Sequence, residues 1–92
     1  MTDPLASLRE RFRARATADR ADLERLADGD RSSTDLRRLV HNLAGTAGTF
    51  GYGALSQAAV EIDDQMALGL QASPENLDRL KERLDEVVRS AS

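Results

Sequence analysis

Hydrophobic residues recur every three or four positions along most of the chain, and this spacing is typical of amphipathic α-helices. Four segments show it, and short connections containing glycine, serine or proline separate them. Consecutive helices joined by short loops pack antiparallel, so the pattern predicts an all-α fold, an antiparallel up-and-down four-helix bundle. The positions expected to face its core are Leu5, Leu8, Phe12, Ala16, Leu23 and Leu26; Leu36, Leu39, Val40, Leu43, Ala47 and Phe50; Leu55, Ala58, Ala59, Ile62 and Met66; and Leu77, Leu80, Leu84 and Val88, with Val87 flanking the last set.

The first helix is the longest that the pattern predicts. Asp3 can serve as its N-cap and Pro4 suits the first helical position, after which one apolar face continues to about Ala27. Asp19 lies near that face, so two shorter helices are the alternative to a single long one. The remaining boundaries are expected at Ser32 or Ser33 and Thr49 for the second helix, at Gly53 or Ala54 and Gly69 for the third, and at Ser73-Pro74 for the start of the fourth.

Length and composition limit the classes of protein to consider. The 92 residues suffice for one domain, 1–92, and a net charge of −3 argues against nucleic-acid binding, which needs a basic surface. The absence of cysteine and the single histidine leave too few ligands for a zinc or haem site, so neither a metal nor a cofactor is expected. No apolar run approaches the ~18 residues of a membrane span, and no leader precedes the first helix. A cytoplasmic protein without membrane contact is therefore expected.

The only histidine, His41, is an unusual feature of the predicted bundle. At about 100° per residue it lies about 140° from the apolar face of the second helix, so it points outward. Two glycines follow it in the same helix, although each costs about 1 kcal/mol relative to alanine in a helix interior. Close approach of a partner would account for them, and helix–helix packing is the alternative. The residues expected to surround His41 and to form a docking surface are Arg37, Arg38, Ala44, Gly45 and Gly48.

Asp63 is the carboxylate best placed to reach His41. The chain reverses near Gly51; His41 precedes that point by roughly 15 Å of helix and Asp63 follows it by roughly 18 Å. A bond from Asp63 to one ring nitrogen would orient the imidazole and leave the other nitrogen free as a nucleophile. An ordinary surface ion pair is the alternative. Because no serine or cysteine nucleophile and no glycine-rich phosphate-binding loop accompanies His41, a hydrolase is disfavoured and phosphoryl acceptance fits better.

The segment from Arg38 to Asp63 resembles the histidine-containing phosphotransfer (HPt) domain, in particular the version found in chemotaxis histidine kinases. It reads R-L-V-H-N-L-A-G-T-A-G-T-F-G-Y-G-A-L-S-Q-A-A-V-E-I-D. The family pattern is H-x-L-K-G, a run of small residues ending in F-G, and then L-x-x-x-A with an acid or amide. The resemblance implies that His41 accepts a phosphoryl group, that Gly45 and Gly48 face a receiver domain, and that Asp63 hydrogen-bonds the histidine.

One position departs from the family pattern, because Ala44 stands where the family has a lysine three residues after the histidine. A cation there would help to hold a phosphoryl group, which carries about −1.5 to −2 charges. Arg37 and Arg38 lie one turn earlier on the same face and are candidates to replace it. A purely solvent-exposed role for both arginines is the alternative.

The sequence therefore predicts a phosphocarrier rather than an enzyme. In this hypothesis it is a phosphorelay intermediate of bacterial two-component signal transduction, and it has no nucleotide-binding segment of its own. Its expected partners are a response-regulator receiver domain, a histidine kinase or both, and the chain is expected to be a monomer. Two alternatives stay open: a helical module that binds a receiver without phosphotransfer, and a dimer formed through the first two helices.

Overall fold

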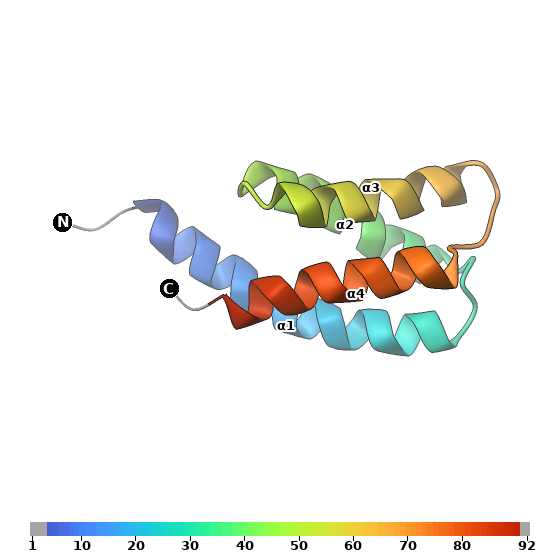
Figure 1. The fold of residues 1–92 in the computed structure, drawn as a ribbon, viewed down its shortest axis with the longest axis horizontal. Coiled ribbons are helices and arrows are strands. Elements are labelled where there is room, and N and C mark those ends of the chain that lie inside the picture. The colour runs from blue at the N-terminus through green and yellow to red at the C-terminus, as the bar shows by residue number, and fades with distance from the viewer. Residues whose placement is uncertain (1–3, 91–92) are drawn as a thin grey trace.

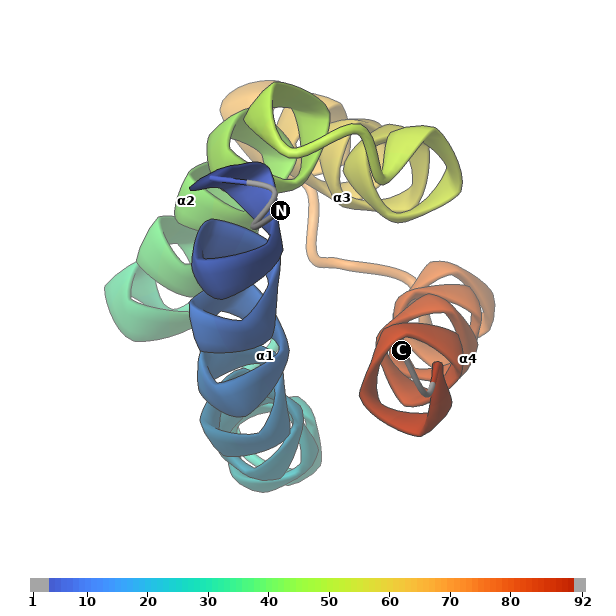
Figure 2. The ribbon, with the colours of Figure 1, turned by 90° about the vertical axis from the view of Figure 1, so that its left-hand side faces the viewer.

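Four helices form in the order that the hydrophobic pattern predicts. The structure, a computed structural model, describes residues 4–90, so the predicted N-cap Asp3 lies outside the described residues. The helices are α1 (Pro4–Asp28), α2 (Thr34–Thr49), α3 (Gly53–Ala67) and α4 (Pro74–Arg89). They run alternately up and down in a bundle of 48 × 21 × 19 Å, with the first and last described residues at the same end (Figures 1 and 2). The predicted all-α four-helix bundle is confirmed.

Serine side chains begin two of these helices. Ser33, rather than Ser32, caps α2, and its hydroxyl oxygen accepts a hydrogen bond from the backbone N–H of Leu36 at 3.1 Å. Ser32 instead donates its hydroxyl to Asp30, and this bond together with the Ser32 backbone N–H lowers the pKa of the Asp30 carboxyl. Ser73 caps α4 in the same way, with Pro74 at the first helical position as predicted.

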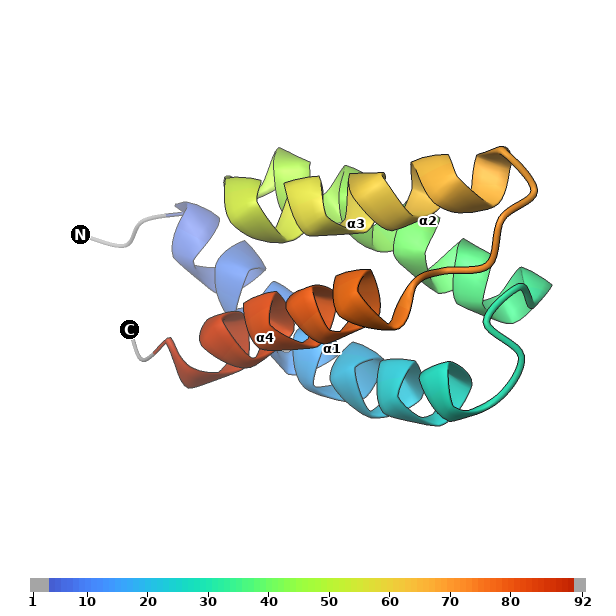
Figure 3. The same cartoon turned by 45° about the vertical axis from the view of Figure 1, so that its right-hand side comes forward.

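Two glycines with positive φ end the second and third helices. Gly51 has φ +85° and Gly69 has φ +81°, a left-handed conformation that costs other residues energy. At each site the following residue donates its backbone N–H to the last turn of the helix, from Tyr52 to Ala47 and from Leu70 to Gln65. The α2–α3 reversal is therefore only three residues long, so the two helices lie side by side with a fixed register (Figure 3).

Most of the predicted core positions are buried, but Leu26, Leu39 and Phe50 are only partly buried, and positions near the two ends of the chain differ. Leu5 and Leu8 are 50% and 39% exposed, because the first turns of α1 extend beyond the other three helices (Figures 1 and 3). On α4, Val87 is buried and Val88 is exposed, so the predicted assignment of that pair was wrong. The buried core residues are Phe12, Ala16, Leu23, Leu36, Val40, Leu43, Ala47, Leu55, Ala58, Ala59, Ile62, Met66, Ala72, Leu77, Leu80, Leu84 and Val87.

Aromatic side chains pack the α2–α3 reversal against α1. The ring of Phe12 stacks on Tyr52 with centroids 5.0 Å apart and lies 5.6 Å from the ring of Phe50. Such pairs each contribute about 0.5–1.5 kcal/mol beyond their buried area. Phe50, expected in the core, packs against it while remaining partly exposed.

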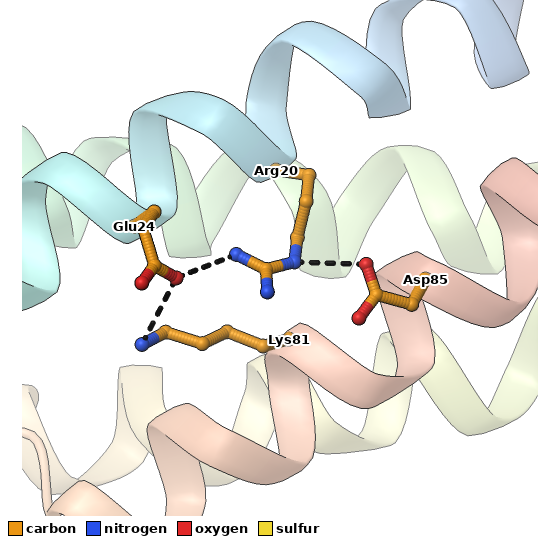
Figure 4. A network of polar contacts seen from close by, with 4 residues as sticks. All are labelled: Arg20, Glu24, Lys81 and Asp85. Atoms are coloured by element: carbon orange, nitrogen blue, oxygen red, sulfur yellow. Dashed lines mark hydrogen bonds and ion pairs between the residues drawn. The ribbon is translucent and has the colours of Figure 1, made fainter.

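Charged side chains join α1 to α4 at mid-length. Arg20 donates from Nε to Asp85 at 2.9 Å and from Nη1 to Glu24 at 2.8 Å, and Lys81 lies 3.3 Å from the same Glu24 oxygen (Figure 4). The hydrogen bond from Arg20, followed by that from Lys81, lowers the pKa of Glu24. Solvent screens exposed pairs of this kind, so the network adds little to the stability of the fold.

Helix α1 is continuous through Asp19, so the single long helix is confirmed and the alternative of two shorter helices is excluded. Burial raises the pKa of the Asp19 carboxyl, and the nearby Arg15 opposes that shift. The partly buried charge is thus tolerated without a break in the helix.

Candidate functional site

The α2–α3 reversal at Gly51 brings His41 and Asp63 to the same height. His41 lies on the outer face of α2, and its side chain is 72% exposed. Its Nδ1 lies 3.1 Å from Oδ2 of Asp63 on α3, which is hydrogen-bond distance. Since the carboxylate can only accept, Nδ1 carries the proton, and Nε2 keeps the lone pair that can attack an electrophile.

Asp63 is much less exposed than the histidine it contacts. Its side chain is 22% exposed, and its second oxygen, Oδ1, is buried without a hydrogen-bond partner among residues 4–90. The nearest cationic group is Nε of Arg37, 3.9 Å from Oδ1, an ion pair too long for a hydrogen bond. The carboxylate therefore links His41 and Arg37 through its two oxygens. The neighbouring acid Glu61 turns instead toward α4, where Arg79 binds it at 2.7 Å.

A groove of about 300 Å³ runs from His41 toward the start of α2. Its lining residues are Thr34, Arg37, Arg38 and His41. Arg38 lies 3.4 Å from Asp35 on the same helix. Both arginines are more than half exposed, and together with His41 they line one side of the groove.

The small residues after His41 differ in what surrounds them. Ala44 is half-buried against the core, and its carbonyl accepts a hydrogen bond from the Ser56 hydroxyl at 2.8 Å. A Cβ added to Gly45 would meet no atom within 4 Å, so packing inside the bundle does not require this glycine. A Cβ on Gly48 would come 3.3 Å from the Ser56 hydroxyl. The close approach of α3 therefore favours a glycine at this position, although its outward direction had argued against a role in helix packing.

Ser56, which the hydrophobic pattern did not mark, also belongs to this region. It lies on α3 within the first turn, and it ties the α2 backbone at Ala44 to α3. No periodic signal marked it, because a half-buried serine resembles an exposed one in the sequence. Only the pairing of α2 with α3 shows its role.

Gly45→Ala is expected to raise the stability of the fold while weakening the binding of a partner. An alanine in an exposed helix interior stabilises the helix by about 1 kcal/mol, and the open space at Gly45 accepts the methyl group without strain. The melting temperature should rise by about 4–8 °C. If a partner packs on this surface, its dissociation constant should rise several-fold, which titration calorimetry would detect.

A higher melting temperature with unchanged partner affinity would contradict a docking role for Gly45. Gly53→Ala is a control, because a Cβ there also meets no atom within 4 Å and the residue lies at the far end of the α2–α3 reversal from His41. That variant is expected to leave partner affinity unchanged.

Two further features of the described residues bear on the site. No three of the acidic, histidine or cysteine side chains in residues 4–90 gather closely enough to hold a metal ion. None of the helices in that range combines the length and the hydropathy that crossing a bilayer requires.

Comparison with known proteins gives one family. A family model described as the Hpt domain matches residues 7–90, which includes all of α2, α3 and α4 and most of α1. No curated protein and no solved structure gives a significant match.

Proposed function

The chain belongs to the Hpt domain family of phosphotransfer modules in two-component signalling, and on that premise we propose that His41 accepts a phosphoryl group from the aspartate of a response-regulator receiver domain and returns it in the reverse step. The observation that carries the proposal is the hydrogen bond from Nδ1 of His41 to Asp63, which leaves Nε2 free on a side chain that is 72% exposed. The half-exposed arginines beside it and the unhindered Gly45 supply a surface that a partner can approach closely.

The proposed transfer exchanges one bond to phosphorus for another. The Nε2 lone pair of His41 attacks the phosphorus of the aspartyl phosphate, an Nε2–P bond forms, and the P–O bond breaks to leave the free aspartate carboxylate. The imidazole thereby gains a positive charge, which the Asp63 carboxylate offsets through the Nδ1–H bond. The partner contributes the metal ion and the groups that stabilise the transferring phosphoryl group.

The role proposed here is that of a phosphocarrier, and Hpt domains are not kinases. We propose that residues 1–92 form one domain, because all four helices contribute to one core. The proposal also includes a cytoplasmic location, a bacterial pathway and a monomeric state. A sedimentation measurement showing a dimer would contradict the last of these.

The test follows radioactive phosphate from receiver domains to this chain. Receivers of response regulators from the same genome are charged with labelled acetyl phosphate, freed of it, and mixed with the protein. We expect label on this chain that is labile in acid and stable in base, that maps to His41 by mass spectrometry and that lies on Nε2 by phosphorus NMR. If receivers bind but no such label forms, the chain is instead a module that binds receivers without transfer, an alternative that Ala44 favours.

Asp63→Asn is expected to slow phosphoryl acceptance at least about tenfold, because the negative charge that offsets the imidazolium is lost and the amide, which can also donate, no longer forces the proton onto Nδ1. The measurement is the initial rate of labelling from a charged receiver, with the melting temperature as a check on folding. Glu61→Gln is the matched control, since Glu61 lies two residues away on α3 but pairs with Arg79. Transfer by Asp63→Asn within twofold of wild type would show that the carboxylate is an ordinary surface acid.

A further inference from the structure

A phosphoryl group on Nε2 of His41, as in the proposed function on which this inference rests, would need a cation beside it, because it carries about −1.5 to −2 charges. The turn of α2 that follows His41 offers none: Ala44, Gly45 and Gly48 carry no charge. The turn that precedes it carries two arginines. Helix α3, which packs beside α2, carries no lysine or arginine either, so the cations that this pair of helices can offer to His41 lie at the start of α2.

The direction of the His41 side chain favours that side. Side chains of an α-helix lean toward its N-terminus, so the imidazole lies over the preceding turn rather than the following one. The groove lined by Thr34, Arg37, Arg38 and His41 is the space beside the ring on that side. Residues four apart on a helix are neighbours, which places Arg37 within reach of a group attached to His41.

The contacts of Asp63 single out Arg37. One carboxylate oxygen binds the imidazole at 3.1 Å, and the other is buried without a hydrogen-bond partner among the described residues while Nε of Arg37 stands 3.9 Å away. Arg37 is thus attracted to the site but held by no hydrogen bond in it, and its side chain is 52% exposed. Arg38 in contrast points to Asp35, an acid outside the His41–Asp63 pair.

We propose that Arg37 moves away from Asp63 when His41 is phosphorylated and then contacts the phosphoryl group. Before transfer, Asp63 is the anion beside a neutral imidazole, and Arg37 is the cation that balances it. After transfer, the imidazole itself is positive and balances Asp63, so Arg37 is released to pair with the phosphoryl oxygens. A guanidinium can bind two such oxygens at once, which suits it to this role. In this arrangement Arg37 replaces a cation at position 44.

The test uses potassium phosphoramidate as the donor, so that no receiver docking is involved. The Nε2–P bond forms, the P–N bond of phosphoramidate breaks, and ammonia leaves. We expect Arg37→Ala to slow labelling of His41 at least about tenfold, as loss of a charge-assisted contact does, and Arg37→Lys to lose less. Arg25→Ala, which removes an exposed arginine from an i,i+3 pair on α1, should match wild type.

A second substitution distinguishes phosphoryl contact from structural damage. Residue 44 is three positions from His41, and a side chain there leans back toward the imidazole. The double variant Arg37→Ala with Ala44→Lys should recover at least half of the lost rate, although it does not restore the pair with Asp63. Failure of that rescue in a protein with wild-type melting temperature would overturn the proposal.

The remaining outcomes are also decisive. If Arg37→Ala reacts with phosphoramidate at the wild-type rate but slows transfer from a receiver, Arg37 is a docking residue and the proposal is wrong. If Arg38→Ala is slower than Arg37→Ala, the cation has been assigned to the wrong arginine. If wild-type protein accepts no label from any donor or receiver, the proposed function itself fails. If wild type and Arg37→Ala are labelled at the same rate, only the role of Arg37 fails.

Discussion

Replacing His41 with glutamine is expected to abolish phosphoryl acceptance completely while leaving the bundle folded. Glutamine keeps a polar side chain of similar reach but has no nitrogen lone pair able to attack phosphorus, so no slower version of the same step remains. The side chain is 72% exposed and its one described hydrogen bond is to Asp63, so the melting temperature should change little. The measurement is label transfer from a charged receiver, followed by circular dichroism on the same sample.

Receiver binding adds a second readout for this variant. The docking surface of Arg37, Arg38, Ala44, Gly45 and Gly48 is intact in His41→Gln, so titration calorimetry should give a dissociation constant within a few-fold of wild type. Label on the variant would show that another residue accepts the phosphoryl group. The proposed relay through His41 would then be wrong even though the fold and family assignment stand.

Leu80→Ala is expected to cause a large loss of stability. Leu80 on α4 is fully buried in the single core cluster, and truncating a buried leucine costs about 2–5 kcal/mol. Domains of this size have a free energy of unfolding of about 5–15 kcal/mol, so the variant loses a large share of it. The melting temperature should fall by roughly 10–30 °C, which thermal unfolding followed by circular dichroism would measure.

Val88→Ala is the matched control, because Val88 lies on the same helix but is 39% exposed. Its unfolding free energy should stay within about 0.5 kcal/mol of wild type. At a temperature where Leu80→Ala remains folded, its labelling rate should equal that of wild type, since Leu80 lies on α4 and the residues around His41 lie on α2 and α3. A loss of less than about 1 kcal/mol in Leu80→Ala would mean that α4 is not packed on the core as described.

Local patterns in the sequence were enough to locate the helices. The periodicity of α2 predicted both its core face and the outward direction of His41, since both depend only on the 3.6-residue repeat. Counting from the Gly51 reversal predicted that Asp63 would reach His41, and the 3.1 Å contact agrees with that expectation. A short antiparallel pair fixes relative height, so this long-range contact could be read from two short distances along the chain.

The 3.6-residue periodicity could not predict how much of each helix's apolar face is covered by the neighbouring helices. Leu5 and Leu8 continue the apolar face of α1 but are 50% and 39% exposed, because the first turns of α1 extend beyond the other helices (Figure 1). Val87 and Val88 are adjacent, and a rotation of α4 by a fraction of a turn decides which one packs. Pairing between helices sets that rotation.

By itself the sequence determined the four helices, the outward histidine and its likeness to the Hpt family, because helix phase and motif spacing are local properties. Only the tertiary structure decided which serine caps α2, that Gly48 but not Gly45 has a neighbour on α3, and that Arg37 rather than Arg38 faces Asp63. These depend on the rotation and separation of two packed helices, to which residues far apart in the chain contribute. The burial of Asp63 Oδ1 and its separation of 3.9 Å from Arg37 Nε are likewise known only from the tertiary structure.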